Sequence, residues 1–146
     1  MPTSRAHSLM VKSRRRNKDA AGCMIIAGNH FLLLQRSKKS YTEPLTWGIP
    51  GGRIDRGESP YEAALRETWE EASIDLTPYY FVEKFSQPLQ NESGYFTTFV
   101  FQFPQIPDWD IEIDYESEDW GWFTLQQMES INLHPGMYYA MAKLGM

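Results

Sequence analysis

The sequence has a single cysteine, three scattered histidines and no apolar run that approaches the length of a membrane span. Cys23 has no partner for an internal disulfide, and its apolar neighbours indicate a buried side chain rather than a nucleophile. The histidines have no metal-ligand spacing, and no Ser–His–Asp or Cys–His arrangement can be assembled. These absences argue against a disulfide-bonded secreted domain, a membrane-spanning helix and the common nucleophilic hydrolases, and they favour a cytoplasmic protein.

Basic residues are scarce after the first twenty positions. That stretch holds six of the 14 Lys and Arg residues but one of the 19 Asp and Glu residues, so the rest of the chain is acidic. An acidic body repels polyanions at long range, which makes duplex nucleic acid an unfavourable partner. We interpret residues 1–19 as a mobile, solvated tail before one domain, residues 20–146. Binding of Arg14–Arg16 to phosphates or anionic lipid, and an organelle transit peptide, are the alternatives.

The remaining chain predicts an α+β fold. Its length and 42% hydrophobic content suffice for one domain with a buried core. Apolar stretches around Gly28–Asn29 predict a β-hairpin, and a short strand is expected to end at Pro50–Gly52. Residues 108–116 alternate acidic with apolar side chains, typical of an edge strand or of an extended loop anchored along one face. The order of elements predicts a mixed sheet covered by helices; strands are expected at 22–27, 31–36, 46–49, 79–86, 95–103 and 120–123, and late helices at 125–130 and 136–144.

One further helix has a clear start. Ser59 is placed as the N-cap, Pro60 takes the first helical position and Glu62 completes a capping box. At about 100° per residue, one arc of this helix is largely apolar and packs, whereas the adjacent arc carries carboxylates. The packing arc comprises Tyr61, Ala64, Leu65, Thr68 and Ala72, and the acidic arc comprises Glu67, Glu70 and Glu71.

The acidic arc predicts a divalent-cation site. Carboxylates at i, i+3 and i+4 repel one another unless a positive charge lies against them. Oxygen-rich sites of this kind suit Mg²⁺ or Mn²⁺. Such ions neutralise anionic oxygens and lower the pKa of bound water. A solvated acidic surface is the alternative, and we prefer it for Glu62, whose capping role already explains its presence.

The stretch from Gly52 to Ile74, GRIDRGESPYEAALRETWEEASI, resembles the Nudix box of Nudix hydrolases. That pattern is Gly, five residues, Glu, seven residues, Arg-Glu, an aliphatic, any residue, Glu-Glu, any residue, Gly and an aliphatic. The preceding Trp47–Gly51 is similar to the usual lead-in. The resemblance extends from about residue 20 to the end and implies an α/β/α sandwich. The positions in register are Gly52, Glu58, Arg66, Glu67, Glu70, Glu71 and Ile74.

The resemblance also implies roles for individual residues. It implies Mg²⁺ or Mn²⁺ as the cofactor, held by the Gly51 backbone carbonyl and by Glu67, Glu70 and Glu71. It implies Arg66, Glu67 and Glu70 as catalytic residues, with Glu67 either a further ligand or the base that deprotonates the attacking water. Arg66 is expected to orient a glutamate, with Glu58 as its structural partner.

Two positions depart from the pattern, and one element is open. Ser73 replaces the usual glycine, and a positive φ there would cost about 1 kcal/mol. Thr68 replaces an aliphatic residue on the packing arc. Many relatives supply a further acidic ligand before the last strand, which Glu116 resembles, with Glu118 and Asp119 as rivals. The alternative for these three is an edge that repels other sheets.

The function that the resemblance implies is hydrolysis of a phosphoanhydride bond in a nucleoside diphosphate linked to another group. A nucleotide-sensing module without catalysis and an RNA 5′-end pyrophosphohydrolase are the alternatives. Tyr41, Trp47 and Tyr95 are candidates to stack on a base, although core packing is the commoner role of aromatic residues. The linked group and the oligomeric state do not follow from the sequence; homodimers are common among relatives.

Overall fold

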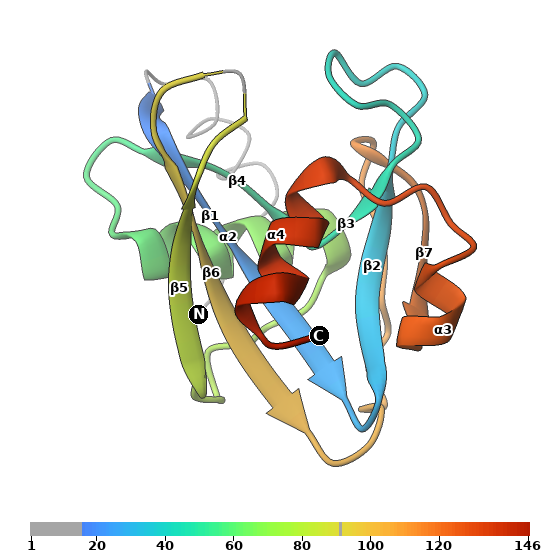
Figure 1. The fold of residues 1–146 in the computed structure, drawn as a ribbon. Coiled ribbons are helices and arrows are strands. Elements are labelled where there is room, and N and C mark those ends of the chain that lie inside the picture. Colours follow the sequence, from blue (N-terminus) through green and yellow to red (C-terminus); the bar gives the residue numbers. More distant parts are fainter. Residues whose placement is uncertain (1–15, 91) are drawn as a thin grey trace.

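The structure is a computed structural model, and it describes residues 16–90 and 92–146 (Figure 1). Most of the predicted tail, residues 1–19, therefore lies outside the described residues, including Arg14 and Arg15. Residues 16–19 form the start of the first strand, β1 (Arg16–Ala27). The strand thus begins four positions before the predicted domain boundary.

A seven-stranded mixed sheet forms the middle of the molecule. The long strand β1 pairs antiparallel with β2 (His30–Arg36), which confirms the hairpin predicted around Gly28–Asn29. On its other side β1 pairs in parallel with β6 (Tyr95–Phe103), from Ala20 opposite Phe96 to Ala27 opposite Phe103. The strand β5 (Glu83–Pro88) lies antiparallel on β6. It begins later than predicted because residues 76–79 form a turn, closed by the Tyr79 amide on the Leu76 carbonyl at 3.0 Å.

The sheet divides along β1. Near its start β1 pairs with β4 (Gly51–Asp55), whereas at its end it pairs with β2. The strand β2 also carries β3 (Trp47–Gly48) and β7 (Ser117–Phe123). The short strand β3 ends before Pro50, as predicted, but the prediction that Gly51 and Gly52 belong to this strand end was wrong, because they begin β4. A Cβ on Gly51 would lie 2.7 Å from the Ala21 carbonyl oxygen, so glycine permits close pairing here rather than a turn.

Helices cover both faces of the sheet, which confirms the predicted α/β/α sandwich. The helix α2 (Pro60–Ala72) covers one face, and α3 (Leu125–Met128) and α4 (Pro135–Lys143) lie on the other side (Figure 1). Alternate residues of β1 enter the two cores: Cys23 and Ile25 pack on the α2 side, and Met24 and Ile26 on the α4 side. None of the described helices has the length and hydropathy needed to cross a bilayer.

Burial of Cys23 raises the pKa of its thiol to about 12. The side chain is fully buried, and its Sγ lies 3.5 Å from the Ala64 carbonyl oxygen of α2. The predicted burial of Cys23 is confirmed, and a thiol with a raised pKa is a poor nucleophile at neutral pH.

The segment 108–116 is an extended loop and not an edge strand. Trp109, Ile111 and Ile113 pack against the α2-side core. The Glu112 amide donates to the Ala72 carbonyl at 3.1 Å, and Ser73 Oγ donates to the Glu112 carbonyl at 3.1 Å. The loop is therefore fixed to the end of α2, which carries the acidic side chains.

Candidate active site

The start of α2 is fixed by the capping box that the sequence predicted. Ser59 Oγ accepts from the Glu62 amide at 3.1 Å, and Glu62 Oε1 accepts from the Ser59 amide at 2.9 Å. Pro60 occupies the first turn. These contacts fix where α2 begins, and Glu67, Glu70 and Glu71 further along the helix are buried.

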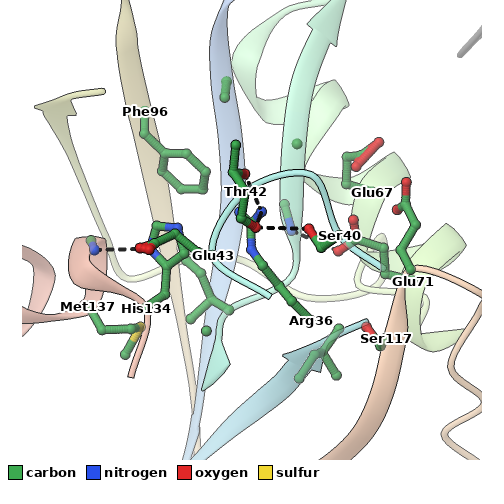
Figure 2. A pocket seen from close by; sticks show the side chains of 18 of the residues that line it. Arg36, Ser40, Thr42, Glu43, Glu67, Glu71, Phe96, Ser117, His134 and Met137 are labelled. Carbon is green, nitrogen blue, oxygen red and sulfur yellow. Dashed lines mark hydrogen bonds between the residues drawn. The ribbon is translucent and has the colours of Figure 1, made fainter. Parts of the chain in front are cut away.

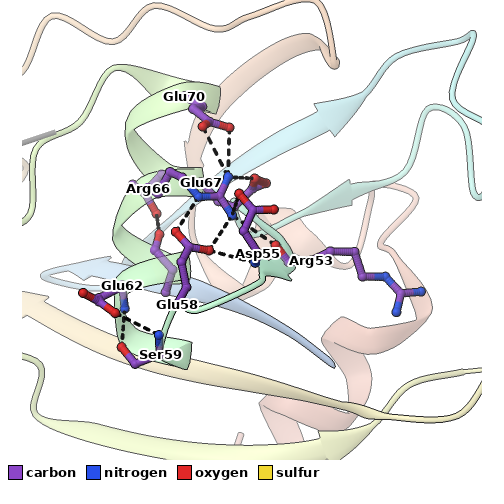
Figure 3. A network of polar contacts seen from close by, with 10 residues as sticks. Arg53, Asp55, Glu58, Ser59, Glu62, Arg66, Glu67 and Glu70 are labelled. Carbon is purple, nitrogen blue, oxygen red and sulfur yellow. Dashed lines mark hydrogen bonds and ion pairs between the residues drawn. The ribbon is translucent and has the colours of Figure 1, made fainter. Parts of the chain in front are cut away.

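Arg66 is the centre of an ion-pair network between α2 and β4 (Figure 3). Its Nε and Nη2 bind the two oxygens of Glu58 at 2.7 and 3.0 Å, so the predicted pairing is confirmed as bidentate. Nη1 donates to Glu67 at 2.7 Å and to Glu70 at 3.2 Å. Asp55 lies 3.3 Å from Nη2. One cation thus holds four carboxylates, of which the sequence argument had identified all but Asp55.

The network keeps Arg66 charged although the side chain is 8% exposed. Burial alone would lower the pKa of its guanidinium. The hydrogen bonds that Arg66 donates to Glu58 and the negative charges of Glu67, Glu58 and Glu70 outweigh that effect, and the pKa lies above its ordinary value. Arg66 is therefore a permanent cation that fixes the orientation of Glu67.

Three carboxylates from two segments converge beside this network. Oxygen atoms of Glu67, Glu71 and Glu116 all lie within 4.8 Å of one another. Glu67 and Glu71 are buried, with 3% and 8% of their surface exposed. Glu71 Oε1 accepts from the Gly51 amide at 3.0 Å, which brings the group to the start of β4. The sequence had proposed Glu116 as one of three rivals.

Backbone contacts position Glu116 and not its rivals at this point. Its amide donates to Asp114 Oδ1 at 3.1 Å, and its carbonyl accepts from the Ser37 amide at 2.9 Å. Glu118 Oε1 accepts from the Lys38 amide at 3.0 Å, and Asp119 accepts from the Trp120 amide at 2.8 Å. These contacts hold Glu118 and Asp119 outside the three-carboxylate group.

Glu70 is not one of the three converging carboxylates. It is buried, and both of its oxygens contact Arg66 Nη1. Its predicted role as a metal ligand stays a prediction, as does the role of the Gly51 carbonyl.

Two glycines of β4 fit closely against functional side chains. A Cβ on Gly52 would lie 2.2 Å from Glu67 Oε2, and a Cβ on Gly51 would lie 2.9 Å from the Phe96 ring. Consecutive strand residues point to opposite faces. The backbone of Gly51–Gly52 is therefore a thin wall between the α2 side and the α4 side of the sheet.

A cleft of about 1130 Å³ contacts both sides of that wall. Figure 2 shows Glu67 and Glu71 at one end and Phe96, His134 and Met137 at the other. The loop 36–43 also lines the cleft. The two ends differ in chemistry: one is acidic and the other is largely apolar.

The sequence argument found only part of the cleft lining. Of its candidates for base stacking, Tyr41 lines the cleft, whereas Trp47 packs edge-on against Phe123 in the core, with ring centroids 4.9 Å apart. Phe96 and Gln87 were missed. Their strands were predicted, but nothing local in the sequence shows which face of a strand meets a cleft.

The converging carboxylates have the chemistry of a divalent-cation site. All three supply hard oxygen donors, and they come from a rigid helix and an anchored loop. Mg²⁺ and Mn²⁺ are bound by such donors together with substrate phosphates and waters. Carboxylates this close together repel unless a cation neutralises them. Glu67, Glu71 and Glu116 therefore fit the ion that the sequence predicted.

Comparison with known families assigns the domain. A sequence model of the NUDIX domain matches residues 16–144. The chain belongs to the Nudix hydrolase family.

The two departures from the Nudix box lie at the end and in the middle of α2, and both are accommodated there. Ser73 takes the left-handed conformation, φ 59° and ψ 34°, which is the positive φ that the usual glycine would adopt without strain. Thr68 Oγ1 donates to the Ala64 carbonyl at 2.8 Å, so the buried hydroxyl has a partner.

Similar Nudix proteins carry several different names. An asymmetrical bis(5′-nucleosyl)-tetraphosphatase of Caenorhabditis elegans is 34% identical over 114 residues, which cover 73% of this chain and 79% of that protein. An RNA pyrophosphohydrolase of Azorhizobium caulinodans is 49% identical over 49 residues, 33% of this chain and 29% of that protein. A nucleoside triphosphate pyrophosphatase/Nudix hydrolase fusion protein of Bifidobacterium longum is 40% identical over 75 residues, 51% of this chain. The chain spans only 15% of the length of that fusion protein.

Solved structures share the Nudix fold. A binary complex of the C. elegans Ap4A hydrolase has a TM-score of 0.68 and 28% identity, covering 87% of this chain and 94% of that one. A bifunctional NMN adenylyltransferase/ADP ribose pyrophosphatase of Francisella tularensis has a TM-score of 0.76 at 20% identity, covering 96% of this chain and 45% of that one. The latter likeness concerns the fold alone.

Proposed function

We propose that this Nudix protein is a metal-dependent hydrolase that cleaves a phosphoanhydride bond in a nucleoside diphosphate linked to another group. The observation that carries the proposal is the convergence of Glu67, Glu71 and Glu116 within 4.8 Å at the acidic end of an open cleft. Family membership supports the reaction class, and the cleft volume is sufficient for a nucleotide.

The metal would be held by Glu67, Glu71 and Glu116, with the Gly51 carbonyl as a further donor. When bound, a divalent cation neutralises the pyrophosphate oxygens and lowers the pKa of the attacking water. The chain supplies the geometry, because Glu71 is tied to the Gly51 amide and Glu67 to Arg66. Preorganised ligands of this kind need little rearrangement during the reaction.

In this proposal Arg66 and Glu70 act as positioning residues, and for Glu70 this replaces the ligand role that the family resemblance implied. Arg66 holds Glu67 through Nη1, and the same nitrogen contacts Glu70. Glu70 therefore helps to fix the position of the Arg66 guanidinium, which in turn orients Glu67. Loss of Glu70 should loosen the site without removing one of the three converging carboxylates.

A set of glutamine variants on α2 tests the assignment. Glu71→Gln should reduce metal-dependent phosphate release by about 100-fold or more, because a charged ligand of the ion is lost. Glu70→Gln should cause a smaller loss, about tenfold, because it acts through Arg66. The matched control is Glu62→Gln, since glutamine serves equally well in a capping box. Thermal unfolding of each variant shows whether the fold is retained.

Near-normal turnover in folded Glu71→Gln would contradict the metal assignment. Equal losses in Glu71→Gln and Glu70→Gln would contradict the distinction between ligand and positioning residue. Both turnover measurements need a substrate. A screen of a nucleotide panel for phosphate release, with Mg²⁺, Mn²⁺ or chelator, identifies one. The panel includes dinucleoside polyphosphates, nucleoside triphosphates, ADP-ribose and 5′-triphosphorylated RNA, because the names of the similar proteins differ in substrate. Nucleotide binding without any product across the panel would favour the sensing module.

A further inference from the structure

The apolar end of the cleft contains one buried amide group whose hydrogen bonding is incomplete. Gln87, on β5, is 7% exposed and lines the cleft. Its Nε2 donates to the Gly136 carbonyl of α4 at 3.2 Å. Its Oε1 is shielded from solvent and has no hydrogen-bond partner among the described residues. A buried polar atom without a partner is destabilising, so its presence in a cleft wall points to a ligand.

The contact with Gly136 fixes which end of the amide is the acceptor. A carbonyl oxygen can only accept, so the Gln87 atom beside it must be the nitrogen. The remaining atom is then an oxygen, and it can receive only an N–H or O–H donor. The terminal torsion of glutamine is broad, so a small rotation that keeps Nε2 against the Gly136 carbonyl can turn this oxygen toward a group inside the cleft.

An aromatic ring lies beside this acceptor. Gln87 and Phe96 are direct cross-strand partners of β5 and β6, so their side chains are neighbours on one face of the sheet. Phe96 lies next to the Gly51 wall, with the acidic group on the other side of β4. A flat ring, a recessed acceptor and a metal site on the same cleft match the parts of a nucleotide in order.

We infer that the Gln87–Phe96 end of the cleft binds a nucleobase that carries an exocyclic amino group. This inference rests on the proposed function, because it assigns the nucleoside part of the substrate. An amino group projects from the edge of adenine, cytosine or guanine and reaches a recessed oxygen. The ring N–H of uracil or thymine is flanked by two carbonyl oxygens, which would be repelled by Gln87 Oε1. The base of the nucleotide lies against Phe96, and the phosphates of the nucleotide extend toward Glu67 and Glu71.

Binding of matched mononucleotides tests the inference without requiring turnover. AMP and purine riboside 5′-monophosphate differ only in the amino group, and CMP and UMP form a second pair. Isothermal titration calorimetry with Mg²⁺ should show that the wild-type protein binds the amino-bearing member about 3–10-fold more tightly. Gln87→Met should bring both ratios close to one while leaving purine riboside monophosphate binding within about twofold.

The control variant is Gln102→Met. Gln102 is an exposed glutamine on β6 that does not line the cleft, so the variant should keep the wild-type ratios. Circular dichroism confirms that each variant is folded. The affinity ratios of the wild-type protein within each nucleotide pair are measured without any variant, so they decide the question even if Gln87→Met does not fold.

Equal affinity of the wild-type protein for both members of each pair would overturn the inference. A preference that persists in folded Gln87→Met, or that disappears in Gln102→Met, would overturn it as well. These outcomes are separate from failure of the proposed function. Hydrolysis across the nucleotide panel without amino discrimination would refute only the base site, whereas amino discrimination without any hydrolysis would refute only the catalytic proposal.

Discussion

At the scale of single residues, the site depends on atoms that are absent. Gly52 has no side chain where Glu67 Oε2 lies, because a Cβ there would be 2.2 Å from that oxygen. The neighbouring glycine meets backbone instead: a Cβ on Gly51 would be 2.7 Å from the Ala21 carbonyl oxygen. The two glycines therefore protect different properties, one the orientation of a carboxylate and the other the pairing of β4 with β1.

Alanine variants of the two glycines should separate these properties. Gly52→Ala should lose about 100-fold in metal-dependent turnover with little change in melting temperature, because the flexible end of Glu67 moves aside and no longer binds the ion. Gly51→Ala should lower the melting temperature clearly, because backbone atoms cannot yield so easily. Phosphate release and thermal unfolding, measured on both variants, check the prediction. Full activity in Gly52→Ala, or an unchanged melting temperature in Gly51→Ala, would show that the contacts are not as close as described.

Residue identity was the part of the site that the sequence could supply. Charged residues at fixed spacing on a helix identified Arg66, Glu67, Glu70 and Glu71 before any fold was known, and the Glu58–Arg66 contact is confirmed. Asp55, Phe96 and Gln87 were not identified. Each of these meets its partner through strand pairing or tertiary packing, and spacing along the chain does not contain that information.

At the scale of elements, α4 begins on a titratable cap. His134 Nδ1 accepts from the Gly136 amide at 3.0 Å, which requires this nitrogen to be unprotonated. Burial lowers the pKa of His134; the positive charge of Arg36 lowers it further, and Glu43 opposes that shift. Protonation would remove the cap and place a cation at the positive end of a helix.

The cap predicts a pH dependence of stability with a defined sign. Because the folded pKa lies below the ordinary value of 6.5, the unfolded chain binds the proton more readily. The contribution of His134 to the free energy of unfolding is therefore fully present above about pH 6.5 and is lost as the pH falls toward the folded pKa. Urea unfolding between pH 7.5 and pH 5 should show a steeper loss for the wild-type protein than for His134→Asn, since asparagine caps a helix without titrating. Parallel curves for the two proteins would contradict this role.

Element boundaries were predicted best where local chemistry decides them. The start of α2 depends on Ser59, Pro60 and Glu62 alone, and it was predicted correctly. The start of β4 depends on the approach of Gly51 to β1, and the sequence had assigned the same glycines to the end of the preceding strand. Segment 108–116 remained undecided because its alternation fits both a strand and an anchored loop; only the contact with Ala72 and Ser73 settles the choice.

At the scale of the whole molecule, the cleft joins parts that are distant in the chain. Its acidic end combines α2 with the loop 108–116, and its apolar end combines β5, β6 and α4. A cation between Glu67, Glu71 and Glu116 would connect the loop to the helix across 45 residues of sequence. Metal binding should therefore stabilise the folded state as a whole and the loop in particular.

Metal titration of the intact protein can test that connection. Adding Mn²⁺ or Mg²⁺ should raise the melting temperature and slow amide hydrogen exchange in residues 112–117, because only the folded state gathers the three carboxylates. At 100 times the dissociation constant, the gain in unfolding free energy should be about 2.7 kcal/mol. Glu116→Gln should lose most of both effects. The matched control is Glu118→Gln, because the Glu118 carboxylate accepts from the Lys38 amide instead. This variant should keep both the rise in melting temperature and the slower exchange. If Glu116→Gln responds to metal as the wild-type protein does while Glu118→Gln does not, the third ligand comes from Glu118, and the convergence of Glu116 with α2 has no part in holding the ion.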